Sequence, residues 1–289
     1  MEIRLPSLSG LFHRREKYFN KLKIVKTKIR ISLVHYLNSA PLGWAFLHGF
    51  LGETFEVIPS SPARCAEQLS KGEVDIGLIP SIEYQRIPDL KIIPGIAIAS
   101  LAEVRSILLV SPWKKEKIRS VALDTNSRSS VVLTKILLEE RLGIQPEYIS
   151  HPPDLGKMLE ICDAALLIGD AALGVDLEKY RTIDLAGMWV QWQRKPFVFA
   201  FWACRSETCS TDGLTDQFQQ AREWGLERRP EIAAVYSDKL KLPKDFLEKY
   251  LFHNINYDLG PEHIRGLEEY YRLAEKRKFI PEIKPLRFL

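Results

Sequence analysis

Strand-like and helix-like segments alternate along the chain from residue 28, and this alternation limits the fold to the α/β class. Short apolar segments typical of buried strands lie at residues 28–34, 55–58 and 74–79, and each runs into a Pro- or Ser-containing helix start. A strand, a helix and the next strand form the unit from which parallel sheets are built. Two more apolar segments, at residues 91–98 and 104–110, predict further strands of this first half.

The alternation restarts after Ser111 and Pro112, which indicates a second lobe. Strands are predicted at residues 120–123, 148–150 and 164–168, and helices at residues 131–142 and 155–160. A long apolar strand then returns the chain to the first lobe, and helices follow: residues 197–204, then 216–227, 230–237, 244–253 and 261–276. We therefore predict an α/β fold of two lobes with a central cleft, in which the C-terminal helices pack on the first lobe. The predicted first lobe comprises residues 28–112 and 204–289, and the second comprises residues 113–203.

Positive charge is concentrated at the N-terminus. Residues 1–30 contain nine Lys or Arg and two acidic residues, whereas the rest of the chain contains 32 basic and 35 acidic residues. A slightly acidic body offers no basic face to a phosphate backbone, so we expect no nucleic-acid partner. We expect residues 1–27 to form a flexible basic leader, and the alternative is a weak helix that binds a membrane surface or a partner.

No segment of the sequence fits export or membrane insertion. The apolar run Leu8–Phe12 is interrupted by Ser9 and Gly10, which does not fit a secretory signal. Every apolar run is far shorter than the roughly 20 residues that cross a bilayer. We therefore predict a cytoplasmic protein without a membrane span. The oligomeric state stays open between a monomer and a homodimer.

Motifs for a metal or a cofactor are absent from the sequence. The six histidines show no HExxH or HxH spacing, and there is no GxSxG elbow, P-loop or GxGxxG turn. The cysteines form no CxxC pair, and we expect reduced thiols at Cys65, Cys162, Cys204 and Cys209. We therefore predict neither a metal nor a cofactor.

The strongest local signal for a site is the polar turn at residues 124–130, between a predicted strand and a predicted helix. Free N–H groups and the dipole attract an anion at a helix start, and the hydroxyls of Ser127, Ser129 and Ser130 add donors. Arg128 could hold a carboxylate through two hydrogen bonds. The turn indicates a carboxylate site, although the same residues also fit a plain helix cap beside a solvated arginine.

A second candidate site follows the first strand. There Tyr36 offers an aromatic wall, and the amide of Asn38 both donates and accepts hydrogen bonds, although an Asx turn explains Asn38 equally well. Asp170 follows the strand at residues 164–168, where it either enters the cleft or stabilises a helix start. Serines at similar positions are individually more typical of caps than of ligand contacts: Ser60, Ser61, Ser81 and Ser106.

Six motifs occur together in an order that resembles a known family. They are YLNSAPL at 36–42, VDIGLIP at 74–80, RSI at 105–107, VALD at 121–124 with SRSS at 127–130, LLIGDAAL at 166–173 and PFVFA at 196–200. Over about residues 28–275 the chain resembles the chorismate dehydratases of the futalosine route to menaquinone. The resemblance implies a type 2 periplasmic-binding-protein fold that works as a cytoplasmic enzyme without a cofactor.

The activity that the resemblance implies is the first step of that route, in which chorismate loses water to give 3-[(1-carboxyvinyl)oxy]benzoate. The resemblance puts Asn38 and Ser106 nearest the reacting ring and the turn of Ser127 to Ser130 at a substrate carboxylate. Chorismate is a small dianion, which suits a cleft of helix starts and hydroxyls. Because no strong base is evident, we hypothesise that the enolpyruvyl carboxylate of the substrate takes the proton while Asn38 and Ser106 hold the geometry. The predicted substrate-binding residues are Tyr36, Ser60, Ser61, Ser81, Ser127, Arg128, Ser129, Ser130 and Asp170.

Two other functions stay open. The first is a non-catalytic cleft protein for a small carboxylate, which the fold alone would favour. The second is the related enzyme of the same route that releases dihydroxynaphthoate from a cyclised futalosine derivative. We expect that enzyme to use a cleft histidine as a base, and His35 is the only candidate here.

Overall fold

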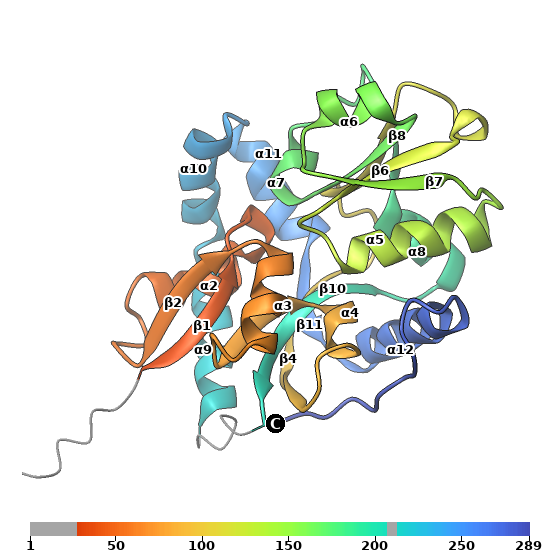
Figure 1. Ribbon diagram of the computed structural model, residues 1–289. Helices are drawn as coiled ribbons and strands as arrows, with labels where there is room; N and C mark the ends of the chain where they lie inside the picture. Colours follow the sequence, from red (N-terminus) through yellow and green to blue (C-terminus); the bar gives the residue numbers. More distant parts are fainter. Residues whose placement is uncertain (1–27, 207–212) are drawn as a thin grey trace, which may run out of the picture.

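The computed structural model describes residues 28–206 and 213–289, so the predicted leader and Cys209 lie outside the described residues. The described chain forms two sheets with helices around them (Figure 1). Within these ranges, no helix combines the length and the apolar character that a bilayer crossing requires. Cys65 and Cys162 are buried free thiols, as predicted, whereas Cys204 is disulfide-bonded, contrary to the prediction.

The first sheet contains six strands in the order β11-β4-β10-β3-β1-β2. Their bounds are β1 (Ile29–Val34), β2 (Phe55–Ser60), β3 (Ile76–Pro80), β4 (Leu90–Ser100), β10 (Phe197–Arg205) and β11 (Asn256–Leu259). Strand β1 pairs in parallel with β2 and β3, and β10 lies antiparallel between β3 and β4. The central strands β3 and β10 are buried along nearly their whole length, which explains why their sequences are continuously apolar.

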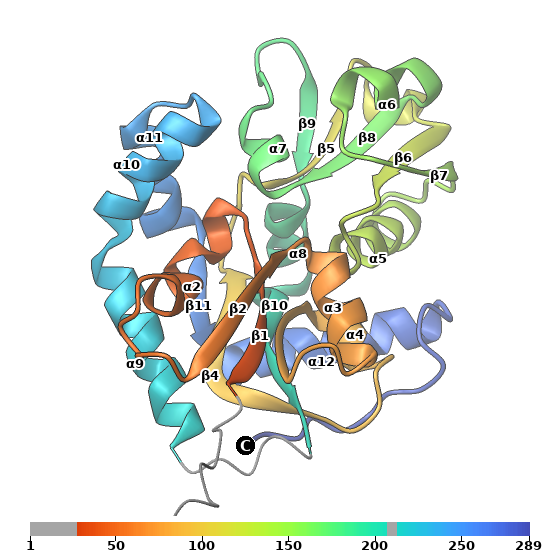
Figure 2. The same ribbon diagram turned by 60° about the vertical axis from the view of Figure 1, so that its left-hand side comes forward.

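The second sheet repeats this arrangement with five strands in the order β7-β6-β8-β5-β9. Their bounds are β5 (Ile107–Ser111), β6 (Ser120–Asp124), β7 (Glu147–His151), β8 (Ala164–Ile168) and β9 (Arg181–Asp184). Strand β6 pairs in parallel with β7 and β8, and β5 lies antiparallel between β8 and β9. Figure 2 shows the two sheets one above the other. They confirm the predicted two-lobed α/β architecture.

The sheet pairing differs from the predicted lobe boundaries for two strands. The boundary at residue 112 put β5 in the first lobe, but it pairs with β8 and β9 of the second sheet. The boundary at residue 203 put β10 in the second lobe, but it pairs with β3 and β4 of the first sheet. Both strands directly follow a crossing between the sheets, at residues 101–106 and 194–196. An apolar pattern shows that such a strand is buried but not which sheet buries it.

Helices follow most strands, as the alternation predicts. They are α2 (Ala40–Leu47), α3 (Pro62–Ser70), α4 (Ser81–Tyr84), α5 (Ser129–Ile136), α6 (Leu155–Ile161), α7 (Gly169–Leu173) and α8 (Leu185–Gln193). The start of α3 follows from its sequence, because the hydroxyl of Ser61 accepts the N–H of Arg64 at 3.4 Å and Pro62 occupies the first helical position. The sequence did not predict β9, α8 or β11.

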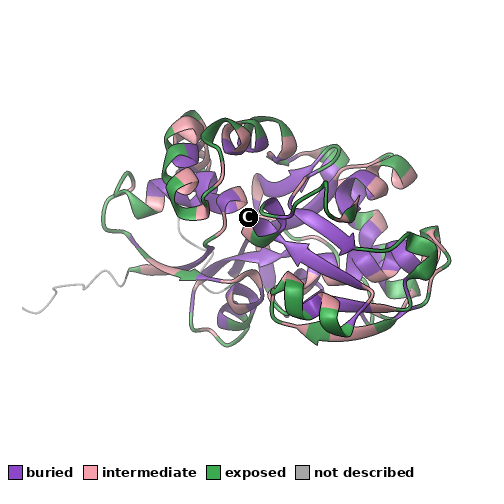
Figure 3. Ribbon diagram, turned by 90° about the horizontal axis from the view of Figure 1, so that it is seen from above, coloured by how far each residue is buried: buried purple, intermediate pink, exposed green. Residues whose placement is uncertain are grey.

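The C-terminal part of the chain is mainly helical and covers the first sheet. Its helices are α9 (Leu214–Glu227), α10 (Arg229–Leu240), α11 (Lys244–Lys249) and α12 (Pro261–Lys276). Helix α9 packs on α2 and β4, and α12 packs on β10 and β11 and also reaches α5. Figure 3 shows buried strands in the interior and helices whose exposed residues face outward. These helices therefore cover the first sheet, and α12 connects it to α5 of the second lobe.

Candidate functional site

A cavity with about 440 Å³ of atom-free space, partly open to solvent, lies between the two sheets. Its wall consists of Val34, Tyr36, Asn38, Pro62, Pro80, Ile98, Ile107, Ser127, Arg128, Ser129, Ser130, Ile168, Gly169, Phe199 and Ala200. Strand ends and helix starts of both sheets supply most of these residues, which is where α/β folds place their ligands. The wall combines an apolar surface with polar groups from two turns, so it suits a small molecule with an apolar ring and polar substituents.

Asn38 enters the cavity wall from the short 3₁₀ helix η2 (Leu37–Ser39) that follows β1. The hydroxyl of Ser39 lies 2.6 Å from the carbonyl oxygen of Val34 and 2.8 Å from that of Tyr36, which fixes the turn. The amide oxygen Oδ1 of Asn38 is buried and has no hydrogen-bond partner among the described residues. A buried acceptor without a donor is costly, so this atom points to a donor that a ligand supplies.

The ring of Tyr36, which follows β1 of the first sheet, packs against Gly169, which follows β8 of the second sheet. Gly169 has a positive φ of 58°, and a Cβ atom at this position would lie 2.6 Å from Cδ2 of Tyr36. Both observations require glycine here. Burial raises the pKa of the Tyr36 hydroxyl, and the nearby carboxylates of Asp124 and Asp170 add to this effect. The hydroxyl therefore stays protonated and can donate to a ligand.

The predicted polar turn lines another part of the cavity. The Asp124 side chain accepts the N–H of Asn126 at 2.8 Å, and its carbonyl oxygen accepts the N–H of Ser127 at 3.0 Å. These bonds close the turn so that Ser127 and Ser130 lie buried in the wall at the start of α5. The first N–H groups of a helix have no partner within the helix, so the start of α5 attracts an anion.

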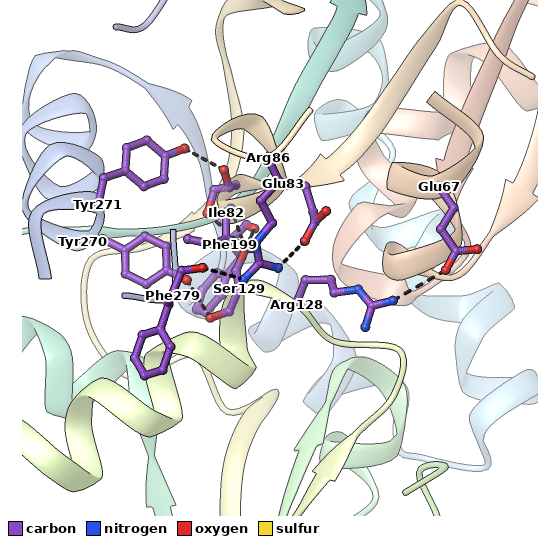
Figure 4. Close-up of polar contacts among 11 residues, drawn as sticks. Glu67, Ile82, Glu83, Arg86, Arg128, Ser129, Phe199, Tyr270, Tyr271 and Phe279 are labelled. Atoms are coloured by element: carbon purple, nitrogen blue, oxygen red, sulfur yellow. Dashed lines mark hydrogen bonds and ion pairs between the residues drawn. The ribbon is translucent and has the colours of Figure 1, made fainter. Parts of the chain in front are cut away.

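Ser129 has a structural role that the sequence did not predict. Its hydroxyl lies 3.1 Å from the carbonyl oxygen of Phe199 and accepts the N–H of Ile82 at 3.2 Å. Its own carbonyl oxygen accepts the hydroxyl of Tyr270 at 2.9 Å, and Figure 4 shows these partners converging on Ser129. Ser129 therefore joins α4, β10 and α12 to the start of α5.

Arg128 lines the cavity, and its guanidinium also faces α3. Its Nη2 atom lies 3.5 Å from Oε1 of Glu67, and both side chains are more than one-third exposed (Figure 4). An exposed ion pair of this kind contributes little to stability, so the guanidinium can exchange Glu67 for a ligand carboxylate at small cost. This geometry allows the predicted carboxylate contact and is also compatible with a solvated arginine.

Asp124, the first residue of the predicted turn, is a buried carboxyl group close to the cavity, and the sequence did not predict a site role for it. Its Oδ2 atom is buried and has no partner among the described residues. Burial raises the pKa of Asp124 to about 6, and the N–H groups of Asn126 and Ile168 only partly offset this effect. The carboxyl group therefore changes its charge near neutral pH beside a cavity suited to anions.

Three of the predicted serine contacts lie outside the cavity wall. The hydroxyl of Ser60 donates to Oε1 of Gln68 at 2.8 Å, Ser61 caps α3, and the hydroxyl of Ser81 donates to the carbonyl oxygen of Val198 at 2.7 Å. Each hydroxyl is thus used inside the protein, which agrees with the capping alternative for Ser61. A substrate contact of these serines stays a prediction.

Ser106 and Asp170 also lie next to the wall rather than in it. Ser106 is fully buried, its neighbour Ile107 lines the cavity, and its carbonyl oxygen accepts the N–H of Gly169 at 2.8 Å. Oδ1 of Asp170 accepts the N–H of Leu37 at 2.8 Å, next to Asn38 in sequence. The structure therefore brings Asn38 and Ser106 to the same region of the molecule, and Asp170 connects α7 to η2.

Tyr36 and Arg128 are the only titratable residues in the described cavity wall. His35 is exposed, and its Nδ1 atom lies 2.7 Å from the carbonyl oxygen of Ser60. Over residues 28–206 and 213–289, no three His, Cys, Asp or Glu side chains are grouped to hold a metal ion. The wall can bind and orient a substrate, but it presents no carboxylate or imidazole that would accept a proton.

Solved structures share this fold at low sequence identity. A protein of Archaeoglobus fulgidus has a TM-score of 0.72 and 17% identity, covering 88% of this chain and 98% of its own. The alkanesulfonate-binding protein of Xanthomonas axonopodis pv. citri, bound to MOPS, has a TM-score of 0.68 and 14% identity, with coverages of 88% and 94%. The periplasmic aliphatic sulphonate binding protein of Escherichia coli has a TM-score of 0.64 and 16% identity, also with coverages of 88% and 94%. These likenesses confirm the periplasmic-binding-protein-like fold.

Sequence comparison assigns the family. The chain is 32% identical over 259 residues to the chorismate dehydratase of Thermus thermophilus, which covers 83% of this chain and 93% of that protein. A family model described as menaquinone biosynthesis matches residues 29–276. Because this match spans most of the chain, the protein belongs to the menaquinone-biosynthesis family.

Proposed function

We propose that this chain is a chorismate dehydratase, a lyase that converts chorismate into 3-[(1-carboxyvinyl)oxy]benzoate and water. The observation that carries the proposal is the cavity wall, which combines Asn38, whose buried amide oxygen has no partner among the described residues, with Arg128 and the start of α5. The family and the chorismate dehydratase of Thermus thermophilus support the same reaction.

The wall suits a dianion that carries an apolar ring. The start of α5, with Ser127, Ser130 and Arg128, is the part of the wall with the most hydrogen-bond donors, so we assign one substrate carboxylate to it. The apolar residues of the wall, such as Ile107 and Phe199, would contact the ring. The Asn38 amide would bind the oxygen substituents beside the reacting carbon atoms.

The reaction needs little chemistry from the protein. A ring C–H bond breaks and its proton passes to the enolpyruvyl carboxylate of the substrate. The C–O bond of the hydroxyl on the neighbouring ring carbon breaks next, and the leaving hydroxide takes up that proton to form water. This restores the carboxylate and leaves an aromatic ring. Asn38 and Ser106 hold the substrate in the geometry that this internal transfer requires. The described wall lacks a carboxylate or histidine, which supports a proton acceptor on the substrate itself.

Incubation of the purified chain with chorismate tests the proposal, with mass analysis for a product lighter by one water. We expect conversion by the wild-type chain, and Asn38→Ala should lower kcat by at least about tenfold. Asn256→Ala is a matched control, because Asn256 lies on β11 outside the described cavity wall and its amide donates to Asp258 on the same strand at 3.2 Å. Chorismate that binds but returns unchanged would establish the binding-only function instead.

The dihydroxynaphthoate-releasing enzyme is a poorer match to this cavity. No histidine belongs to the described wall, and a ring nitrogen of His35 is in contact with the carbonyl oxygen of Ser60. Incubation with the cyclised futalosine derivative tests this function directly. Release of dihydroxynaphthoate, together with inert chorismate, would replace our proposal.

We further propose that the reaction is the first step of the futalosine route and takes place in the cytoplasm, as the resemblance implies. The disulfide at Cys204 argues against a cytoplasmic location, because disulfides are rare in reducing compartments. Thiol alkylation of the protein in freshly lysed cells, read by mass, tests the location. Full alkylation of the four cysteines would support a cytoplasmic enzyme, and a protected pair would contradict it.

A further inference from the structure

The hydroxyl of Ser106 has one partner among the described residues, and that partner comes from a distant part of the chain. The hydroxyl of Tyr250 donates to Oγ of Ser106 at 2.7 Å, and both side chains are buried. Tyr250 begins the π-helical turn Tyr250–Asn254 that follows α11. Single π-helical turns are rare and are frequent at functional sites, so this turn marks the contact as a candidate for function.

The contact determines where the proton of Ser106 can point. A serine hydroxyl carries one proton, and because its oxygen already accepts from Tyr250, its own proton must be donated elsewhere. No acceptor for this proton occurs among the described residues. Burial raises the pKa of Tyr250 far above its ordinary value, so the phenol stays protonated and always acts as the donor.

The backbone of Ser106 is fixed as tightly as its hydroxyl. The preceding residue, Arg105, has a positive φ of 66°, which is uncommon for a residue other than glycine. Oδ2 of Asp184 accepts the N–H of Arg105 at 2.6 Å, and the Arg105 guanidinium donates to the carbonyl oxygens of Ala172 and Val175, each at 2.9 Å. Such strain persists only where surrounding contacts enforce it, and it is common at functional sites.

Ser106 thus stands at the first crossing between the sheets, directly beside the cavity. Its carbonyl oxygen binds the N–H of Gly169, and both Gly169 and Ile107 line the cavity. The turn after α11 holds the Ser106 hydroxyl, and contacts from α7 and the end of β9 hold its neighbour Arg105. A position held from so many sides maintains one side-chain geometry, which catalysis requires.

We propose that Tyr250 is a positioning residue for the dehydration, which orients the Ser106 hydroxyl so that its proton is donated to a substrate oxygen. The inference rests on the proposed function of this cavity. A hydroxyl that accepts a hydrogen bond is polarised into a stronger donor, so the chain from Tyr250 through Ser106 to the substrate strengthens the last bond. Tyr250 acts only through Ser106 and has no contact with the substrate.

A double-mutant cycle tests this role with chorismate as the substrate. Tyr250→Phe removes only the hydroxyl and should lower kcat by roughly tenfold while changing KM by less than about threefold. In a Ser106→Ala background the same substitution should change kcat by less than about twofold, because the group through which it acts is gone. Tyr257→Phe is the matched control, since Tyr257 is buried on β11 and its hydroxyl has no partner among the described residues. It should leave kcat unchanged.

The outcomes separate this inference from the proposed function. Wild-type kcat in Tyr250→Phe, or an equal loss in the Ser106→Ala background, overturns the positioning role and leaves the dehydratase proposal standing. A wild-type chain without product overturns both. If Tyr250→Phe does not fold, 3-fluorotyrosine at position 250 keeps the hydroxyl and makes it a stronger donor. That variant should change kcat in the Ser106 protein and leave Ser106→Ala unaffected, and equal effects in both overturn the role.

Discussion

The buried carboxyl group of Asp124 predicts a specific dependence of stability on pH. The informative substitution is Asp124→Asn, which keeps the shape of the side chain and an oxygen that can accept the N–H of Asn126. It removes only the ability to ionise. The comparison of the two proteins across pH therefore reports the free energy of placing this negative charge inside the fold.

The size and sign of the effect follow from the pKa of Asp124, which burial raises from its ordinary 3.8 to about 6. A carboxyl group with a raised folded pKa contributes its stability below the unfolded pKa and loses it as pH rises through the folded pKa. A difference of about two pKa units corresponds to about 3 kcal/mol. Between about pH 3 and about pH 7, the wild-type chain should therefore lose about 3 kcal/mol of unfolding free energy relative to Asp124→Asn.

Urea unfolding of both proteins at several pH values measures this difference. The new amide of the variant places an NH₂ group where Oδ2 lacked a partner, which costs about 1–3 kcal/mol at every pH. This cost lowers the unfolding free energy of the variant by the same amount at every pH. The prediction therefore concerns how the difference between the two proteins changes with pH. Thr125→Ser, an exposed substitution in the same turn, should differ from the wild type by a constant amount. A constant difference for Asp124→Asn as well would refute the buried-charge argument.

Three other substitutions test the cavity wall and the contacts that hold it in place. Arg128→Ala should raise KM for chorismate at least about tenfold while lowering the unfolding free energy by less than about 1 kcal/mol, measured by steady-state kinetics and urea titration. Gly225→Ala should lower the melting temperature sharply, because its Cβ atom would lie 1.8 Å from the carbonyl oxygen of Pro41 and force α9 away from α2. Asp170→Ala should lower kcat/KM by leaving the N–H of Leu37 without its acceptor, and Asp170→Asn, which retains an acceptor, should recover most of the activity.

The sequence predicted the strands and helices whose pattern is local and strong. Buried strands such as β3 and β8 are continuous apolar segments, and the helix start at Ser61 and Pro62 carries its own cap. Strands β9 and β11 have four residues each, and β9 has no fully buried residue, so neither contains a pattern that periodicity can detect. Helix α8 mixes apolar and small residues without a clear polar face, which hides it for the same reason.

The site could be predicted only in part, because a sequence pattern shows which strand a residue follows but not which partner its side chain contacts. The turn at residues 124–130 and Asn38 both follow strand ends, and both line the cavity. Ser60 and Ser81 follow the same rule, yet their hydroxyls bind Gln68 and the backbone of Val198. The contact between Tyr250 and Ser106 spans 144 residues of sequence, and only the packing of the C-terminal helices brings it about.

Hydrogen bonds between the two lobes surround the cavity of this protein. The N–H of Leu37 donates to Asp170, the N–H of Ala63 donates to the carbonyl oxygen of Asn126 at 3.1 Å, and Ser129 binds residues of the first half. A catalytic site needs its groups held within about half an ångström, which such bonds provide and a free hinge does not. Each of these bonds includes a residue of, or next to, the cavity wall. An opening of the cleft would break these contacts, so we expect product release and chemistry to depend on the same residues.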